Sequence, residues 1–420
     1  MNIRIYINDK FSLVQILTYL LCISPFLYIS GPLFTDILVC LCGLIFLIEI
    51  IRKKRIREYL SVYTAIYLLW CAYLIIRSLF AENIFVSLQS SLFYFRFGFF
   101  LLSITYVIKE NKNFLKYFFY FLLSSYVLLS FDALIQYLSG SNILNFHYNS
   151  SRLAGLFGDE YILGSYFSRL FPILLMLYFC YFKNIRVEFL ILISIPIFFI
   201  ILISGERTAL FYFVITFILM FLTIKQLRFS VIILFLIGIL ISVSTILFDN
   251  NIKKRLIDKT LIDTNIIKGN INIFSPKHEA LYLSSLKMIS SNYLFGVGPK
   301  MFRIKCDDEE YFVRTNQYSD SCSTHPHNIY LQLFAETGLF GFLPFLIFSI
   351  YIFYILFKII IFSFNNKNYS NQFCLSLIAV IIFLWPLIPT GSFFSNYINY
   401  INYLSLGFLL HFYNNEYMKN

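Results

Sequence analysis

Continuous apolar runs of about 20 residues constrain the fold of this 420-residue sequence more than any other feature. A helix needs a run of that length to cross a bilayer, whereas a membrane β-strand shows shorter segments of alternating polarity. The sequence therefore predicts an all-α polytopic membrane protein with about twelve transmembrane helices. The runs lie at residues 11–29, 33–51, 59–80, 84–108, 114–138, 160–182, 187–204, 208–224, 229–248, 328–362, 371–389 and 398–413.

Composition supports a membrane protein, because 59% of the residues are hydrophobic and only 13% are charged. We expect a single membrane domain over residues 1–420, surrounded by the lipid bilayer and without a soluble catalytic domain. The first run is long and lacks a small-x-small cleavage site, so we expect it to remain as a span. The net charge of +11 is explained by loop topology, and we expect no nucleic acid partner.

Basic loops set the expected orientation, because cytoplasmic loops of membrane proteins are enriched in Lys and Arg. The basic segment Arg52–Arg57 follows the second run, which places this segment and the N-terminus in the cytoplasm. By the same alternation the C-terminus is also cytoplasmic. Later loops on the same side contain Lys109 and Lys112, Lys183 and Arg186, Lys225 and Arg228, and Lys358 and Lys367.

A long loop at residues 249–327 separates the ninth and tenth spans and is expected on the external face. It is basic, yet loops beyond about 60 residues cross a membrane regardless of charge. A basic external loop favours an anionic partner, and lipid phosphates are the nearest candidates. Ser275 and Pro276 predict a helix start within this loop, because serine caps helices and proline suits the first helical position. His278 would then lie in the first turn.

Two cysteines, Cys306 and Cys322, lie in the long loop, while the other cysteines lie in apolar runs and act there as small hydrophobic residues. An oxidising compartment would allow these two to pair in a single way. We therefore expect a disulfide that holds the acidic segment 307–310 beside the histidines.

Two histidines precede the tenth span in the segment His325-Pro326-His327-Asn328. Proline is accepted in the first turn of a helix, so we expect the helix to start at Pro326 with His327 in that turn. The free N–H groups of a first turn disfavour an imidazolium, so His327 should stay neutral and able to accept a proton near neutral pH.

A polar stripe follows on the same run, because Asn328, Gln332 and Glu336 recur every four residues. Polar groups at membrane depth face protein or a water-filled cavity. The stripe is therefore either a seam between helices or part of a polar site.

Cationic residues gather near the expected external face. Arg152 and Arg207 lie at external ends of spans, where positive charge opposes the topological bias and is typical of function. Lys300 and Arg303 follow the glycine turn Gly296–Pro299, which is either a plain turn or, with the two cations, a phosphate site.

Arg96 differs from these residues because it lies within a span, at a depth comparable to Asp132. We expect the two to form a buried ion pair between helices.

These segments together resemble the O-antigen ligase and O-antigen polymerase superfamily along the whole chain. The resemblance rests on Gly155–Asp159 before a span, Ser204–Arg207 between two spans, Phe295–Pro299 in the long loop, and His325–Asn328 followed by Glu336–Gly341. In that family a glycan on polyprenyl pyrophosphate is transferred outside the inner membrane without a nucleotide or a required metal.

By position, the resemblance makes His327 the essential histidine and Arg207 the essential arginine. It implies that arginine stabilises the pyrophosphate while His327 accepts the proton of the acceptor hydroxyl. Many ligases have an arginine early in the loop helix, where this sequence has His278 or Lys277. The expected residues are catalytic His327, Arg207 and His278 and substrate-binding Arg152, Lys300, Arg303, His325 and Glu336, with no metal ligand and no cofactor.

We therefore expect a metal-independent, O-antigen ligase-like glycosyltransferase in the bacterial inner membrane, with a periplasmic active site. Its donor would be a polyprenyl-pyrophosphate-linked glycan and its acceptor the lipid A core. The alternative is a polymerase that joins lipid-linked repeat units, and these residues do not separate the two.

Two other classes of protein remain open. A flippase or exporter for lipid-linked glycans would need charges accessible from both faces. A zinc site built from His278, His325 and His327 would use suitable ligand types, although the His-x-His spacing is a weak signal.

Overall fold

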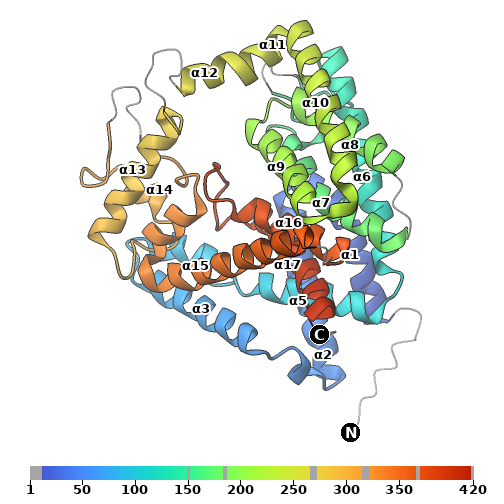
Figure 1. The fold of residues 1–420 in the computed structure, drawn as a ribbon. Helices are drawn as coiled ribbons and strands as arrows, with labels where there is room; N and C mark the ends of the chain where they lie inside the picture. The colour runs from blue at the N-terminus through green and yellow to red at the C-terminus, as the bar shows by residue number, and fades with distance from the viewer. Residues whose placement is uncertain are drawn as a thin grey trace.

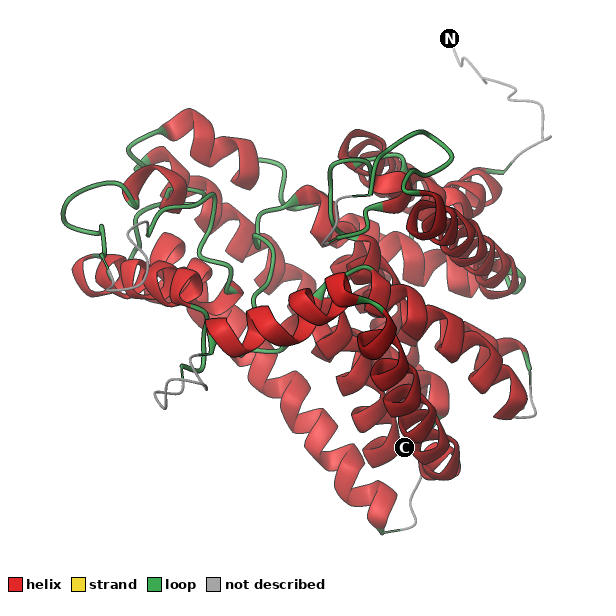
Figure 2. Cartoon of the chain, turned by 90° about the horizontal axis from the view of Figure 1, so that it is seen from above, coloured by secondary structure: helices red, strands yellow, loops and turns green. Residues whose placement is uncertain are grey.

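The computed structural model describes residues 12–148, 152–182, 187–264, 272–314, 321–365 and 369–417. Within these ranges the chain consists of helices and loops without a β-strand, as Figure 2 shows. The apolar runs form α1 Leu13–Ile29, α2 Pro32–Arg52, α3 Val62–Leu79, α4 Ile84–Ser91, α5 Arg96–Glu110, α6 Phe114–Ser139, α7 Leu163–Tyr181, α8 Val187–Ile203, α9 Arg207–Thr223, α10 Arg228–Phe248, α15 Ile329–Phe364, α16 Asn371–Leu384 and α17 Asn396–Tyr417. The long loop contains α11 Asn250–Lys253, α12 Lys259–Asp263, α13 Pro276–Ser291 and α14 Phe302–Lys305.

The prediction of an all-α membrane protein is confirmed, since seven helical segments in the described ranges are long and apolar enough to span a membrane. They are α2, α3, the α4–α5 pair, α6, α7, the segment Lys225–Phe248 that includes α10, and α15. The apolar helices α1, α8, α9 and α16 are shorter. A helix of 14 residues such as α16 is about 21 Å long, less than the hydrocarbon core of about 30 Å. The count of twelve spans therefore stays a prediction.

Helices α7 and α16 form the centre of the bundle. Both are buried along most of their length and pack against each other, while α17 packs against α16 and α5. Beyond their first two turns, which in α7 contain Ser165 and Arg169, both sequences are apolar on all sides, as expected of helices surrounded by protein. Figure 1 shows α11, α12 and α13 at one end of the molecule and the end of α17 at the other.

Helix α15 covers the apolar run at residues 328–362, which is longer than one span needs, and it is interrupted at Gly338, where φ is +63°. The kink leaves backbone carbonyls without a partner inside the helix, and the loop after α13 donates hydrogen bonds to them. The N–H groups of Val297 and Gly298 donate to the carbonyls of Ala335 and Glu336 at 2.9 and 2.8 Å. The loop after α13 is thus joined to α15 by its backbone.

Close approach at this kink requires glycine on both sides. Gly296 has φ of +70°, and a Cβ there would lie 2.5 Å from the backbone of Glu336. A Cβ on Gly338 would lie 2.4 Å from the backbone of Leu294. Arg77 of α3 completes the junction by donating to the carbonyls of Phe295 and Gly296 at 2.8 and 2.6 Å.

The expected pair of Arg96 and Asp132 is wrong. Arg96 forms its ion pair with Asp36 of α2 at 2.7 Å, because α2 packs along α5. Asp132 is fully buried and accepts hydrogen bonds from the side chain of Asn142 and the backbone of Ile143, both at 3.2 Å.

The expected orientation can be tested by thiol labelling of exposed residues in α13 and in the loop before α3. Of the basic residues used to derive it, Lys183, Arg186 and Lys367 lie outside the described residues. A Ser290→Cys variant should react with an impermeant thiol reagent in intact spheroplasts, whereas the matched Ser61→Cys variant should react only after lysis. The reverse pattern would overturn the orientation.

Substitution at the α15 junction should measure the contribution of close backbone packing. Gly296→Ala should lower the free energy of unfolding by more than about 1 kcal/mol, because alanine is strained at positive φ and its Cβ collides with α15. The control Gly238→Ala places a Cβ in α10 at an ordinary 3.6 Å from Phe198. Thermal unfolding in detergent should separate the two variants, and equal midpoints would contradict the packing argument.

Candidate functional site

The segment before α15 does not start the helix where the sequence suggested. Helix α15 begins at Ile329, and Asn328 caps it by accepting hydrogen bonds from the N–H groups of Tyr330 and Leu331 at 3.0 and 3.1 Å. His327 precedes the cap with a left-handed φ of +57°. The prediction of a helix start at Pro326 is therefore wrong, because the Asn328 side chain satisfies the free N–H groups instead.

Three histidines meet at this point. The ring centroids of His325 and His327 lie 4.1 Å apart, and those of His278 and His327 lie 5.5 Å apart. His278 comes from α13, which begins at Pro276 after Ser275 as the sequence predicted. Ser275 does not cap this helix through its side chain; its Oγ instead lies 2.7 Å from Nδ1 of His278. The structure thus gathers the histidines from two separate segments into one cluster.

The ring of His325 is held on both sides. Its Nδ1 lies 2.9 Å from Oγ1 of Thr324, and its Nε2 lies 3.3 Å from the carbonyl of Thr390. A carbonyl only accepts, so Nε2 carries the hydrogen and Nδ1 accepts from the threonine hydroxyl. With both nitrogens engaged, His325 is suited to orient its neighbours rather than to take up a proton.

Burial keeps the whole histidine cluster neutral. It lowers the pKa of His278 to about 4 and that of His325 to about 3, with the neighbouring His327 as the next cause. The pKa of His327 is also lowered, first by burial and then by Lys277. The expected direction for His327 was right, but its cause is loss of water and a nearby lysine rather than a helix N-terminus.

The segment between α16 and α17 closes this cluster and was not recognised from the sequence. The N–H of Thr390 donates to the carbonyl of His327 at 2.7 Å, in addition to the contact with His325. The sequence predicts a span over residues 371–389, but α16 ends at Leu384, so the last residues of that run belong to this segment. Pro386 and Pro389 are the signal that could have separated it, because proline ends a helix.

The polar stripe of α15 forms a seam inside the protein. Gln332 donates to Glu336 at 3.2 Å and to Ser392 at 3.0 Å, and its oxygen accepts from the N–H of Phe393 at 2.8 Å. Glu336 is fully buried and also accepts from the N–H of Phe302 at 3.1 Å. Its carboxylate therefore joins the loop to α15, and its expected role in substrate binding stays a prediction.

Arginines surround the turn between α8 and α9. Arg207 forms an ion pair with Asp263 of α12 at 2.9 Å, and Nη1 donates to Thr260 at 3.1 Å. Arg255 donates to the carbonyl of Gly205 in the same turn at 3.2 Å. Arg255 lies in a π-helical turn, Lys254–Asp258, a distortion common at functional sites, and sequence reasoning did not single it out.

Arg152 lies next to the α8–α9 turn, because the N–H of the adjacent Leu153 donates to the carbonyl of Ser204 at 3.3 Å. Its guanidinium stacks on the ring of Tyr161 at 4.8 Å, and its Nε is buried without a hydrogen-bond partner. Burial, Arg152 and Arg207 together lower the pKa of Arg255, which reflects how closely the three positive charges are held.

A buried carboxyl balances this arginine cluster only in part. Glu206 accepts hydrogen bonds from the N–H of Gly164 and the hydroxyl of Ser165, both at 2.7 Å. Burial raises its pKa to about 7, so the group is partly protonated at neutral pH. Asp263 is then the main negative charge beside Arg152, Arg207 and Arg255, and the cluster carries an excess of positive charge.

The arginine and histidine clusters are coupled electrostatically. Arg207 and Asp263 are close enough to His278 that both alter its pKa, Arg207 downwards and Asp263 upwards. His278 in turn contacts His327. A cluster with excess positive charge and a cluster of neutral imidazoles are therefore linked through Arg207 and His278.

Lys300 and Arg303 are placed differently from what the glycine turn suggested. The N–H groups of Val297 and Gly298 are used by α15, so this turn does not offer them to a phosphate. Burial and then Arg303 lower the pKa of Lys300, and Arg303 also lowers that of His325. Arg303 is therefore coupled electrostatically to Lys300 and to His325, whereas Arg207 is coupled to His278.

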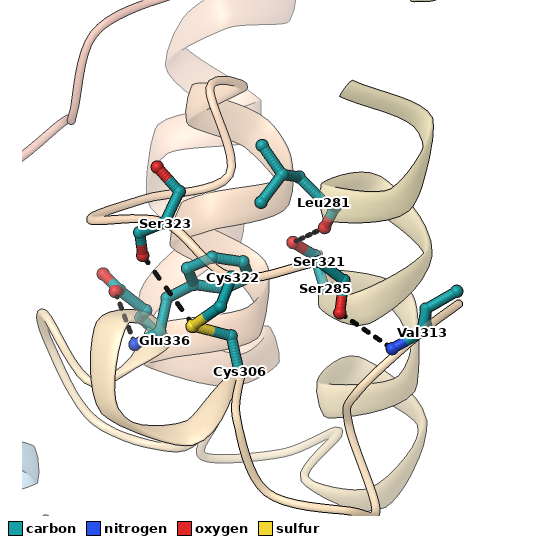
Figure 3. The surroundings of a disulfide bond; sticks show 9 residues. Leu281, Ser285, Cys306, Val313, Ser321, Cys322, Ser323 and Glu336 are labelled. Atoms are coloured by element: carbon teal, nitrogen blue, oxygen red, sulfur yellow. Dashed lines mark hydrogen bonds between the residues drawn. A yellow bond between two sulfur atoms is a disulfide. The ribbon is translucent and has the colours of Figure 1, made fainter. Parts of the chain in front are cut away.

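Cys306 and Cys322 are joined by a disulfide whose Cα atoms lie 5.0 Å apart, next to α13 and Glu336 (Figure 3). The bond ties the end of α14 to the segment that leads into the histidines. Of the acidic run, Asp308 pairs with Lys305 at 3.0 Å, and Lys305 also contacts Glu82. Among the described residues no group of three or more His, Cys, Asp or Glu side chains has the arrangement of a metal site.

Part of the chain matches a known protein family. Residues 189–346 match the family described as O-antigen ligase. The matched segment contains the α8–α9 turn, the long loop, the histidines and the kink of α15, but not the motif at residues 155–159. Neither the curated proteins nor the solved structures contain a significant match.

Proposed function

This chain belongs to the O-antigen ligase and polymerase superfamily through residues 189–346, and from that premise we propose that it transfers a glycan from polyprenyl pyrophosphate to an acceptor hydroxyl. The reaction would take place at the periplasmic face of the bacterial inner membrane. The observation that carries the proposal is the arginine cluster at the α8–α9 turn, electrostatically coupled through Arg207 to the histidine cluster.

Arg207, Arg255 and Arg152 would bind the pyrophosphate of the donor. Guanidinium groups match phosphate oxygens in pairs, and the excess positive charge of the cluster favours a polyanion. The same contacts stabilise the charge that grows on the pyrophosphate as the bond to the sugar breaks. The hydrogen bonds of Arg207 to Asp263 and Thr260 hold it in place before the donor binds.

His327 would act as the general base. The acceptor oxygen attacks the anomeric carbon, the carbon–oxygen bond to the pyrophosphate breaks, and the hydroxyl proton passes to the neutral imidazole of His327. Polyprenyl pyrophosphate leaves with the bonding electron pair. His325, fixed by Thr324 and Thr390, would orient His327, while His278 contacts the base and is coupled electrostatically to Arg207. No nucleotide enters this step.

Lys300 and Arg303 would bind on the acceptor side, because Arg303 acts on His325 rather than on the arginine cluster. We propose the lipid A core as acceptor, which makes the protein a ligase. Purified protein in lipid vesicles, supplied with a lipid-linked glycan, should transfer it to added lipid A core. Transfer only to a second lipid-linked repeat unit would contradict the ligase assignment and identify a polymerase.

Kinetics should separate the roles of His327 and Arg207. His327→Ala should lower the single-turnover rate by roughly 10²–10⁴-fold with donor affinity largely kept, because a general base acts mainly in the transition state. Arg207→Ala should weaken both donor affinity and rate, and Arg207→Lys should recover only part, since lysine cannot bind two oxygens in a planar fork. An unchanged rate in folded His327→Ala protein would remove His327 from the mechanism.

A further inference from the structure

An arginine that the mechanism does not use lies inside a membrane span. Arg169 is in α7, six residues after its first residue Leu163 and so about 9 Å along the helix. Helix α7 is a candidate span that is buried along most of its length, and Arg169 is half-buried within it. A charge at this depth costs free energy and is typically retained for function.

The charge of Arg169 has no carboxylate partner in the described part of the chain. Its Nη2 donates to the hydroxyl of Tyr212 in α9 at 3.2 Å, and the guanidinium lies 4.6 Å from the centre of that ring. A guanidinium has five N–H donors, so most of them remain available. By contrast, Arg96 pairs with Asp36, and Arg228 donates to Phe221 and Ser363.

Arg169 lies directly below the arginine cluster. Ser165, one turn earlier on the same face of α7, donates to Glu206 in the α8–α9 turn. Gly164 permits this contact, since a Cβ there would lie 2.6 Å from the hydroxyl of Ser204. Tyr212 lies five residues after Arg207 in α9. Arg207 therefore lies at the end of the α7–α9 pair that meets the α8–α9 turn, and Arg169 lies about one layer of side chains deeper in the same pair.

Tyr212, the partner of Arg169, is also coupled electrostatically to the histidine-bearing helix α13. Burial, and to a smaller extent Tyr212, raise the pKa of Tyr282 to about 12, which places Tyr212 near α13. Tyr282 in turn contacts His278, with ring centroids 6.2 Å apart. Arg169 is thus linked through Tyr212 and Tyr282 to the histidine cluster, from a position one layer deeper in the membrane than Arg207.

We propose that Arg169 binds the lipid-side phosphate of the donor, beneath the arginines that bind the sugar-side phosphate. This inference rests on the proposed function. The polyprenyl chain lies in hydrocarbon, so the phosphate attached to it is the deeper of the two. An arginine with free donors in a water-poor site is suited to bind two phosphate oxygens. The lipid-side phosphate keeps this contact through the reaction, because only the bond between sugar and pyrophosphate breaks.

Binding of two carrier lipids can test this division. The probes are a polyprenyl monophosphate and a polyprenyl pyrophosphate of equal chain length, added to the full-length protein in lipid nanodiscs. Arg169→Gln should weaken binding of both about tenfold or more, the loss expected for one charge-assisted hydrogen-bonding contact. Arg207→Gln should weaken binding of the pyrophosphate only. The control Arg228→Gln, an arginine at the opposite end of the bundle, should leave both affinities unchanged.

The outcomes distinguish the inference from the function on which it rests. Wild-type protein that binds neither lipid would contradict the proposed function. Wild-type protein that binds both, with unchanged monophosphate affinity in Arg169→Gln, would overturn the role of Arg169 alone. If Arg169→Gln does not fold, Arg169→Lys carries the test: weaker monophosphate binding at an unchanged unfolding midpoint supports the proposal, and wild-type affinity contradicts it.

Discussion

The backbone junction between the kink of α15 and the loop at residues 293–298 is the contact on which the site depends. Gly338 interrupts the helix, and the freed carbonyls of Ala335 and Glu336 accept hydrogen bonds from the loop. Arg77 secures the loop from α3. The first half of α15 carries the polar seam, so this junction also fixes the helix that begins directly after the histidines. A buried kink without such partners would leave several backbone groups without hydrogen bonds.

Burial then gives the two clusters opposite electrostatic properties. The histidines lose contact with water and stay neutral, which leaves His327 in the form that can accept a proton. The arginines keep their charge because guanidinium deprotonates only at extreme pH, while the balancing carboxyl of Glu206 is partly protonated. In the proposed reaction, one loss of water would thus prepare a neutral base and an excess of positive charge. This separation of roles is what glycosyl transfer from a pyrophosphate requires.

Much of the fold was predictable from the sequence because hydrophobic runs and helix-start residues act locally. The runs became helices, and α13 began at Pro276 as its Ser-Pro pair indicated. Contacts between distant segments were not predictable, since they depend on how helices pack. Arg96 therefore pairs with Asp36 instead of Asp132. The N–H groups of the glycine turn donate to α15 instead of being available to a phosphate. Arg255 and Arg169 were missed for the same reason, because nothing in their local sequence shows what they face.

The central claim is that the arginine and histidine clusters act on one donor molecule, and an experimental structure of the protein with bound polyprenyl-pyrophosphate-linked glycan tests it most directly. The account predicts phosphate oxygens within hydrogen-bonding distance of Arg207 and Arg255, with the anomeric carbon between the pyrophosphate and the ring of His327. A pyrophosphate held by Lys300 and Arg303, with Arg207 still paired to Asp263 and no ligand beside it, would contradict the account.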